Sequence, residues 1–136
     1  MQTKSIYVNL PVKDLAKTRD CWPKLGFSFN EEFSNDSGLC LILKEDSIYV
    51  MLLKHEFFST FTDRPIADSS STQVLFAIEV ESREKVEEMI KTALENGATR
   101  YRESTDHGWM YYDCIADLDG HQWEILHTDR SKMPAS

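Results

Sequence analysis

The sequence is poor in the features that mark several classes of protein. It has three cysteines, four prolines and five glycines in 136 residues, and no cysteine stands in a CxxC or Cys/His spacing. A disulfide framework or a zinc ribbon is therefore not expected, and each cysteine is predicted to pack as a small apolar residue. No apolar run approaches the roughly 18 residues of a membrane span, and no signal-peptide pattern is visible, so a soluble cytoplasmic protein is expected.

Positive charge is also scarce. The chain has 15 lysines and arginines against 23 aspartates and glutamates, which gives a formal net charge of −8. Nucleic acids and anionic membranes are bound through basic patches, so neither is an expected partner. The acidic balance is mildly compatible with a cationic ligand, although most acidic proteins are merely soluble.

Apolar spacing and turn residues predict the same order of elements in each half of the chain. A helix from Leu15 with Asp14 as its N-cap and Gly26 at its end, and a second helix after Ser82, are expected. A helical turn is expected at 55–61, and the polar segment 63–72 reads as a linker or a mobile flap. The expected strands are 6–12, 27–33, 39–43 and 48–53 in the first half, and 73–80, 99–102, 109–116 and 121–127 in the second.

The two halves read as copies of one module. Equivalent positions are Val12 and Val80, Gly26 and Gly97, and Met51 and Glu124, at offsets of 68 (80 − 12), 71 (97 − 26) and 73 (124 − 51). The prediction is one α+β domain over 1–136, with tandem βαβββ modules at about 4–62 and 73–129. A repeated unit usually cannot bury its sheet face alone, and two facing half-sheets would form a cup-shaped half-barrel. Two unrelated α+β stretches remain the alternative, because few residues are identical between the halves.

The stretch from Asp117 to Leu126 draws attention to Glu124. Its Asp119-Gly120 pair predicts a tight hairpin in which both central residues adopt positive φ. Glu124 follows within a run of Trp, Ile and Leu, where an unpaired carboxylate costs free energy. Two interpretations stay open: Glu124 is a functional base or ligand contact, or it is a structural carboxylate hydrogen-bonded by Tyr7 or Asn9.

Three motifs stand near the two ends of the chain: Asn9-Leu10-Pro11-Val12-Lys13-Asp14-Leu15, Leu25-Gly26-Phe27 and Asp117-Leu118-Asp119-Gly120-His121-Gln122-Trp123-Glu124. Together they resemble the glyoxalase / bleomycin-resistance / extradiol-dioxygenase (vicinal oxygen chelate) superfamily, and the resemblance covers nearly the whole chain. Three further segments are Glu56-Phe57-Phe58, Val80-Glu81-Ser82-Arg83 and Asp106-His107-Gly108-Trp109-Met110-Tyr111. They are similar to a bacterial branch of this superfamily labelled as predicted lactoylglutathione lyases.

The resemblance implies paired βαβββ modules around a cup, a homodimer and, in metal-using members, one divalent ion in the cup. The family's metal-ligand positions fall on Tyr7, Met51, Leu75 and Glu124, and only Glu124 matches the expected ligand type. A phenol, a thioether and an aliphatic carbon are poor partners for a hard cation, so a divalent metal is disfavoured here. Asn9 shares a strand face with Tyr7 and could enter this set.

Other residues are predicted to contact a small-molecule ligand. Two catalytic residues are predicted. Glu124 is the candidate carboxylate, and His107, beside Gly108 in a turn, is a candidate proton shuttle or ligand contact. Trp109 and Tyr111, together with the four cup positions Tyr7, Asn9, Met51 and Leu75, are expected to bind a flat organic ligand. For His107 the alternative is an exposed turn histidine, and for the aromatics it is sheet core.

Two functions from different classes follow. One is a lactoylglutathione-lyase-like enzyme with a degenerate metal site, in which Glu124 moves a proton. The other is a metal-free protein of the bleomycin-resistance type that sequesters a small organic molecule in its cup. The missing metal ligands and the acidic charge favour the second, and the lyase-labelled branch favours the first.

Overall fold

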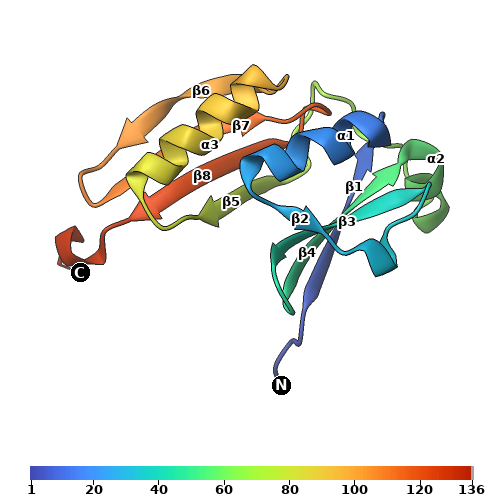
Figure 1. Cartoon of the computed structure of the whole chain (residues 1–136), viewed down its shortest axis with the longest axis horizontal. Helices are drawn as coiled ribbons and strands as arrows, with labels where there is room; N and C mark the ends of the chain where they lie inside the picture. Colours follow the sequence, from blue (N-terminus) through green and yellow to red (C-terminus); the bar gives the residue numbers. More distant parts are fainter. Residues whose placement is uncertain (136) are drawn as a thin grey trace. The chain divides into compact units, whose positions relative to one another are not determined.

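The computed structural model describes residues 1–135 and divides into two compact units, Met1–Ile66 and Ala67–Ser136. Each unit contains one four-stranded mixed sheet with helices, which confirms the predicted α+β class and the two tandem modules (Figure 1). In the described part of the chain, no helix has the length and apolar character that a membrane crossing requires.

The first unit has the strand order β1-β4-β3-β2. β1 pairs in parallel with β4, and β3 pairs antiparallel with both β4 and β2. Its elements are β1 (Ile6–Val12), α1 (Leu15–Cys21), the 3-10 turn η1 (Trp22–Leu25), β2 (Ser28–Phe29), η2 (Glu31–Phe33), β3 (Gly38–Lys44), β4 (Ile48–Lys54), α2 (His55–Phe58) and η3 (Ser59–Phe61).

Local chemistry sets the ends of α1. The Asp14 side chain accepts a hydrogen bond from the Lys17 amide at 3.0 Å, as expected of an N-cap. Pro23 cannot donate an amide hydrogen bond, and the chain tightens into η1 before Gly26 ends it with φ +97°. The expected strand at 27–33 is wrong beyond Ser28–Phe29, because the Asn30 side chain caps η2 by accepting from the Glu32 amide.

The second unit repeats this plan with the strand order β5-β8-β7-β6 (Figure 1). β5 pairs in parallel with β8, which lies inside the sheet between β5 and β7. β6 is twice as long as the predicted strand at 99–102. The elements are β5 (Leu75–Glu79), α3 (Arg83–Glu95), β6 (Thr99–Asp106), β7 (Met110–Ala116), β8 (Gln122–Thr128) and η4 (Arg130–Lys132).

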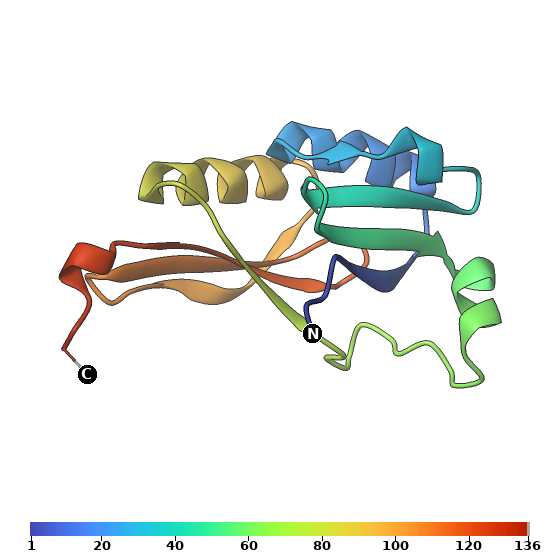
Figure 2. The same cartoon turned by 90° about the horizontal axis from the view of Figure 1, so that it is seen from below.

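α3 covers one face of the second sheet (Figure 2). The buried face of α3 packs over β7 and β8, where Ile115, Trp123 and Ile125 are almost inaccessible to solvent. The Trp123 ring stacks on the Phe76 ring, with ring centroids 4.3 Å apart. Strand side chains alternate between faces. We call the opposite face the distal face of the second sheet; it carries Leu75, Ala77, Glu79, Tyr112, Cys114, Glu124 and Leu126.

The strand registers establish the internal repeat. Asn9 pairs with Met51 in the first sheet, and Ala77 pairs with Glu124 in the second, at offsets of 68 (77 − 9) and 73 (124 − 51). The offsets equal those between the halves of the sequence. On β3 and β7 the equivalents are Cys40, paired with Met51, and Cys114, paired with Glu124. The distal face of the first sheet, by this equivalence, carries Tyr7, Asn9, Cys40, Tyr49 and Met51.

The hairpin before β8 is held by the carboxylate of Asp117. Its Oδ1 accepts from the amides of Asp119 and His121 at 2.9 and 3.0 Å, and its Oδ2 accepts from the Trp123 indole at 3.0 Å. Only Gly120 has a positive φ, +82°, so the expectation that Asp119 shares this conformation is wrong. The turn closes instead through the Gly120 amide and the Asp117 carbonyl, 3.0 Å apart. Burial raises the pKa of the Asp117 carboxyl.

Replacing Asp117 by Asn should lower the free energy of unfolding by about 1–3 kcal/mol, because the amide group cannot accept both the backbone and the indole hydrogen bonds. Denaturant unfolding followed by tryptophan fluorescence measures the change. Asp36→Asn, at an exposed turn carboxylate of the first unit, is the control and should change stability by less than about 0.5 kcal/mol. Equal effects of the two substitutions would contradict the role given to Asp117.

Candidate functional site

Glu124 lies in the middle of the distal face of the second sheet. β8 places it opposite Ala77 of β5 on one side and Cys114 of β7 on the other. Directly opposed residues of paired strands lie within side-chain contact, so the Glu124 carboxylate and the Cys114 thiol are neighbours on this face. The carboxylate is half-buried, and within its own unit it accepts no hydrogen bond from the residues that the structure describes.

A tyrosine absent from the sequence-based predictions completes this cluster. β6 pairs Thr99 with Ala116, Arg102 with Cys114 and Thr105 with Tyr112, so three residues of β6 span two of β7 at each step. Each such step is a β-bulge, which re-aims side chains. Tyr101 lies within the first bulge, close enough to Cys114 and Glu124 for both to contribute to the raised pKa of its hydroxyl.

The Tyr101 hydroxyl and the Cys114 thiol both hold their protons tightly. Burial is the largest cause and raises the pKa of Tyr101 to about 12, with smaller contributions from Cys114 and from the negative charge of Glu124. Burial likewise raises the pKa of the Cys114 thiol. The cluster therefore consists of one carboxylate beside two neutral hydrogen-bonding groups, with Arg102 close enough to oppose both shifts.

This donor set does not fit a divalent metal ion. A hard cation needs several anionic oxygen or neutral imidazole ligands, whereas the thiol and phenol beside Glu124 stay protonated at neutral pH. Leu75, on the same face, has no donor atom. Among residues 1–135, no group of three or more His, Cys, Asp or Glu side chains is placed to hold a metal ion.

The predicted residues of the first module lie on the distal face of the first sheet. Asn9 and Met51 are register partners across β1 and β4. Tyr7 is about half-exposed and stacks on its own partner Tyr49, with ring centroids 4.7 Å apart and planes inclined by 12°. This face offers an amide, a thioether and stacked phenols, which suit a flat organic ligand better than a cation.

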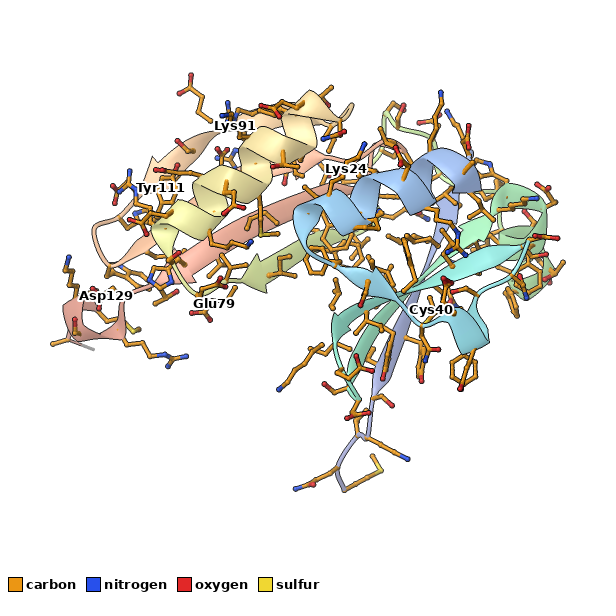
Figure 3. All side chains as sticks on the ribbon, viewed as in Figure 1. Lys24, Cys40, Glu79, Lys91, Tyr111 and Asp129 are labelled. Carbon is orange, nitrogen blue, oxygen red and sulfur yellow. The ribbon has the colours of Figure 1, made fainter. Side chains whose placement is uncertain are left out.

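Tyr111 and Trp109 lie apart from Glu124. Tyr111 (labelled in Figure 3) occupies the α3 side of the sheet. The Arg83 guanidinium lies 4.1 Å from the centre of its ring. Trp109 and Tyr111 line a cavity of about 230 Å³ beside the first turn of α3. The His107 ring in the preceding turn is 6.4 Å from the Trp109 ring and 6.2 Å from that of Tyr112. No interaction between His107 and Glu124 is seen in the described residues.

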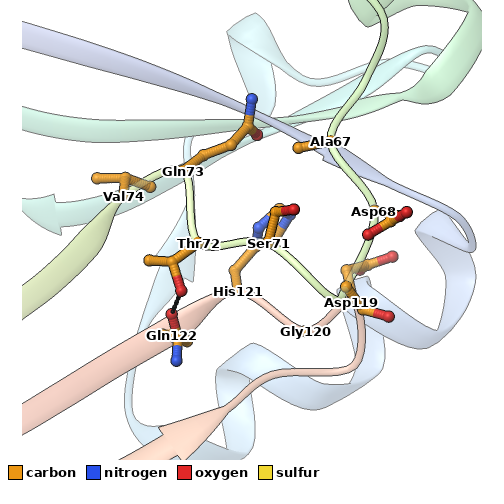
Figure 4. Close-up of a pocket in the computed structure, with 11 residues that line it drawn as sticks. Ala67, Asp68, Ser71, Thr72, Gln73, Val74, Asp119, Gly120, His121 and Gln122 are labelled. Atoms are coloured by element: carbon orange, nitrogen blue, oxygen red, sulfur yellow. Dashed lines mark hydrogen bonds between the residues drawn. The ribbon is translucent and has the colours of Figure 1, made fainter.

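Part of the segment predicted as a linker packs on the hairpin of the second unit. Residues 67–74 and 119–122 enclose a polar cavity of about 30 Å³, the size of a water site (Figure 4). The Thr72 hydroxyl donates to the Gln122 side-chain oxygen at 2.6 Å. A Cβ on Gly120 would come within 3.1 Å of the Ser69 Cβ, so glycine lets the two loops approach.

The comparisons with known proteins agree with this architecture. A family model described as the Glyoxalase/Bleomycin resistance protein/Dioxygenase superfamily matches residues 4–125. The solved structure of hypothetical protein SA1046 from S. aureus has 23% sequence identity and a TM-score of 0.78. The match covers 93% of this chain and 95% of the SA1046 chain. No curated protein sequence matches significantly.

Two further solved structures are similar in fold. A glyoxalase/bleomycin resistance protein/dioxygenase family enzyme from Burkholderia phytofirmans has 17% identity, a TM-score of 0.72, and coverage of 90% of this chain and 96% of its own. A bleomycin resistance determinant encoded on the transposon Tn5 has 16% identity, a TM-score of 0.61, and coverage of 93% and 99%. At these identities the likeness shows the fold.

The raised pKa of Tyr101 predicts a pH effect on stability. The folded protein keeps this proton up to about pH 12, whereas a tyrosine in the unfolded chain loses it near its ordinary pKa of about 10. Its contribution to the free energy of unfolding is fully present below about pH 10 and is lost as the pH rises toward 12. In an ultraviolet pH titration, Tyr101→Phe should lack the part of the tyrosinate absorbance that appears near pH 12 in the wild-type protein. Loss of amplitude in the ordinary range would contradict the assignment.

Proposed function

The chain belongs to the glyoxalase/bleomycin resistance protein/dioxygenase superfamily, and from that premise we propose that it binds a small organic molecule against the distal face of its second sheet. Glu124 supplies the acidic contact, and no metal ion held by the protein takes part. The observation that carries this proposal is the half-buried Glu124 carboxylate, which lies beside the neutral side chains of Cys114 and Tyr101, with Arg102 nearby, and accepts no hydrogen bond from the described part of its unit.

A carboxylate removed from water without a partner is costly, and the cost is recovered when a ligand brings a donor or a positive charge. The surrounding face is suited to hold the rest of an organic molecule. Leu75 and Ala77 of β5 and Leu126 of β8 are apolar, and Tyr112 adds an aromatic surface. The net charge of −8 also favours the approach of a cationic ligand.

Two kinds of occupant are supported. An organic cation would pair with Glu124, in the manner of a sequestering protein; the Tn5 relative is described as a bleomycin resistance determinant. A carbonyl compound such as a lactoylglutathione-like thioester would place its oxygen near Tyr101, and the protein would then be a lyase-type enzyme. In both cases the site is metal-independent, because its donors do not fit a divalent ion.

The test uses two probes, metal-free bleomycin and S-lactoylglutathione, titrated into the protein by isothermal calorimetry in buffer with EDTA. At least one probe should bind, and Glu124→Gln should weaken that binding by about tenfold or more, since the charge-assisted contact is lost. Glu79→Gln is the matched control. Glu79 (labelled in Figure 3) is an exposed carboxylate at the end of β5. It lies on the same face, two positions after Ala77, and its replacement should change affinity by less than about twofold.

Three outcomes would contradict the proposal. They are binding of neither probe, equal losses from the Glu124 and Glu79 substitutions, and binding that disappears in EDTA. Equilibrium dialysis against Ni²⁺ or Zn²⁺ gives a second check, in which the wild-type protein and Glu124→Gln should retain the same substoichiometric amount of metal.

A further inference from the structure

The cavity of about 230 Å³ beside the first turn of α3 lies on the α3 side of the second sheet, away from Glu124. The strand registers place part of its lining: Asp106 pairs with Tyr111, and Tyr111 pairs with His127, so the three stand in one row across β6, β7 and β8. Directly paired residues are neighbours on one face of a sheet. The volume is below the roughly 300 Å³ at which drug-sized pockets begin, so the cavity suits a small molecule.

The arginine in the lining of this cavity is already satisfied by the protein. The Arg83 guanidinium donates to the carboxylates of Asp106 at 2.6 Å and of Glu87 at 3.3 Å. It also lies 4.1 Å from the centre of the Tyr111 ring. An anionic ligand would have to displace carboxylates that are already in place, so these contacts do not favour an anion.

Asp129, labelled in Figure 3, brings a carboxylate to the same cavity. Its Oδ1 accepts from the amide and the hydroxyl of Ser131 at 3.1 and 2.6 Å, and these bonds lower the pKa of the carboxyl. Its Oδ2 accepts no hydrogen bond from residues 1–135, because the Lys132 ammonium nitrogen is 3.8 Å away, too far for one. One oxygen of an ionised carboxylate is therefore available to a ligand.

An aromatic ring and a neutral acceptor accompany this oxygen in the lining. The Asp129 amide donates to the Trp109 carbonyl at 2.7 Å, which holds the carboxylate next to the half-buried Trp109. The His127 Nδ1 lies 3.0 Å from the Val80 carbonyl oxygen, and because a carbonyl only accepts, Nδ1 carries the proton. The neutral imidazole then has Nε2 as a hydrogen-bond acceptor. The lining thus combines an aromatic ring with two acceptors.

We propose that this cavity binds a small protonated amine. The ammonium group donates hydrogen bonds to Asp129 Oδ2 and to His127 Nε2, and the Trp109 ring attracts its positive charge. The organic part of the molecule occupies the rest of the cavity. This site lies on the opposite face of the sheet from Glu124, so it does not depend on the ligand proposed for the distal face.

Three probes of similar shape and different charge test the proposal: 2-phenylethylamine, 2-phenylethanol and 3-phenylpropanoate. Each is titrated at neutral pH into the ¹⁵N-labelled full chain, and chemical shifts report the affinity and the place of binding. The amine should perturb the amides of His127 and Asp129 and the indole N–H of Trp109. It should bind about tenfold or more tightly than the other two probes, since they lack the charged donor.

Three results of these titrations would overturn the proposal. They are the absence of binding by the amine, equal affinity for the neutral or the anionic probe, and shifts confined to the neighbours of Glu124. The last result would assign the amine to the distal face. Failure of the proposed function at Glu124 would leave the shifts around Asp129 unchanged, so the two conclusions are tested separately.

Asp129→Asn tests the carboxylate with little risk to the fold, because asparagine also caps η4 but carries no charge. It should weaken binding of 2-phenylethylamine by about tenfold or more. The matched control is Asp14→Asn, the same change at the N-cap of α1, which should alter the affinity by less than about twofold. Equal losses in the two variants would contradict the role of Asp129.

Two further variants test the ring and the charge of the ligand. Trp109→Leu should weaken binding of 2-phenylethylamine by about two- to fivefold, the range for a partly exposed cation–π contact, and unchanged affinity would contradict the role of the ring. Lys132→Gln removes an ammonium group that competes for Asp129, so it should tighten binding of the amine. Weaker binding in Lys132→Gln would indicate a site for negative charge and would overturn the proposal.

Discussion

The register of β8 is the constraint on which the candidate site depends. A shift of one residue would move Glu124 to the α3 side and bring Trp123 to the distal face. Asp117 opposes such a shift, because its two carboxylate oxygens accept hydrogen bonds from the backbone amides of Asp119 and His121 in the turn and from the Trp123 indole in β8. The buried Trp123 ring, stacked on Phe76, adds a large packing cost to the same slip.

The two modules share a backbone plan but differ in chemistry. Their sheets have the same strand order and the same offsets between paired positions, so Met51 and Glu124 occupy equivalent places beside Cys40 and Cys114. Only the second module places a carboxylate there. A repeated scaffold keeps the positions while side chains diverge freely, which is how one fold can support metal-dependent chemistry, metal-free chemistry or binding alone.

The sequence was most informative where local chemistry decides structure. The N-caps Asp14 and Ser82, the stop at Gly26 and the helix after Ser82 followed from capping rules and apolar spacing. Glu124 was identified because a carboxylate stands in an apolar strand. The sequence was less informative where two strands had to be aligned. The length of β6 was underestimated, and Tyr101 escaped notice because a bulge leaves no mark on hydrophobic alternation.

The sequence by itself determined that the chain is an acidic α+β protein built from a doubled βαβββ module, because periodicity, capping and turn chemistry act over a few residues. Only the tertiary structure decided which side chains share a surface. It separated Tyr111 from Glu124 by placing them on opposite faces of one sheet, and it brought Tyr101, Cys114 and Glu124 together from three strands. Such groupings arise from strand pairing between residues distant in sequence, and pairing register is set by packing and by bulges that no local pattern encodes.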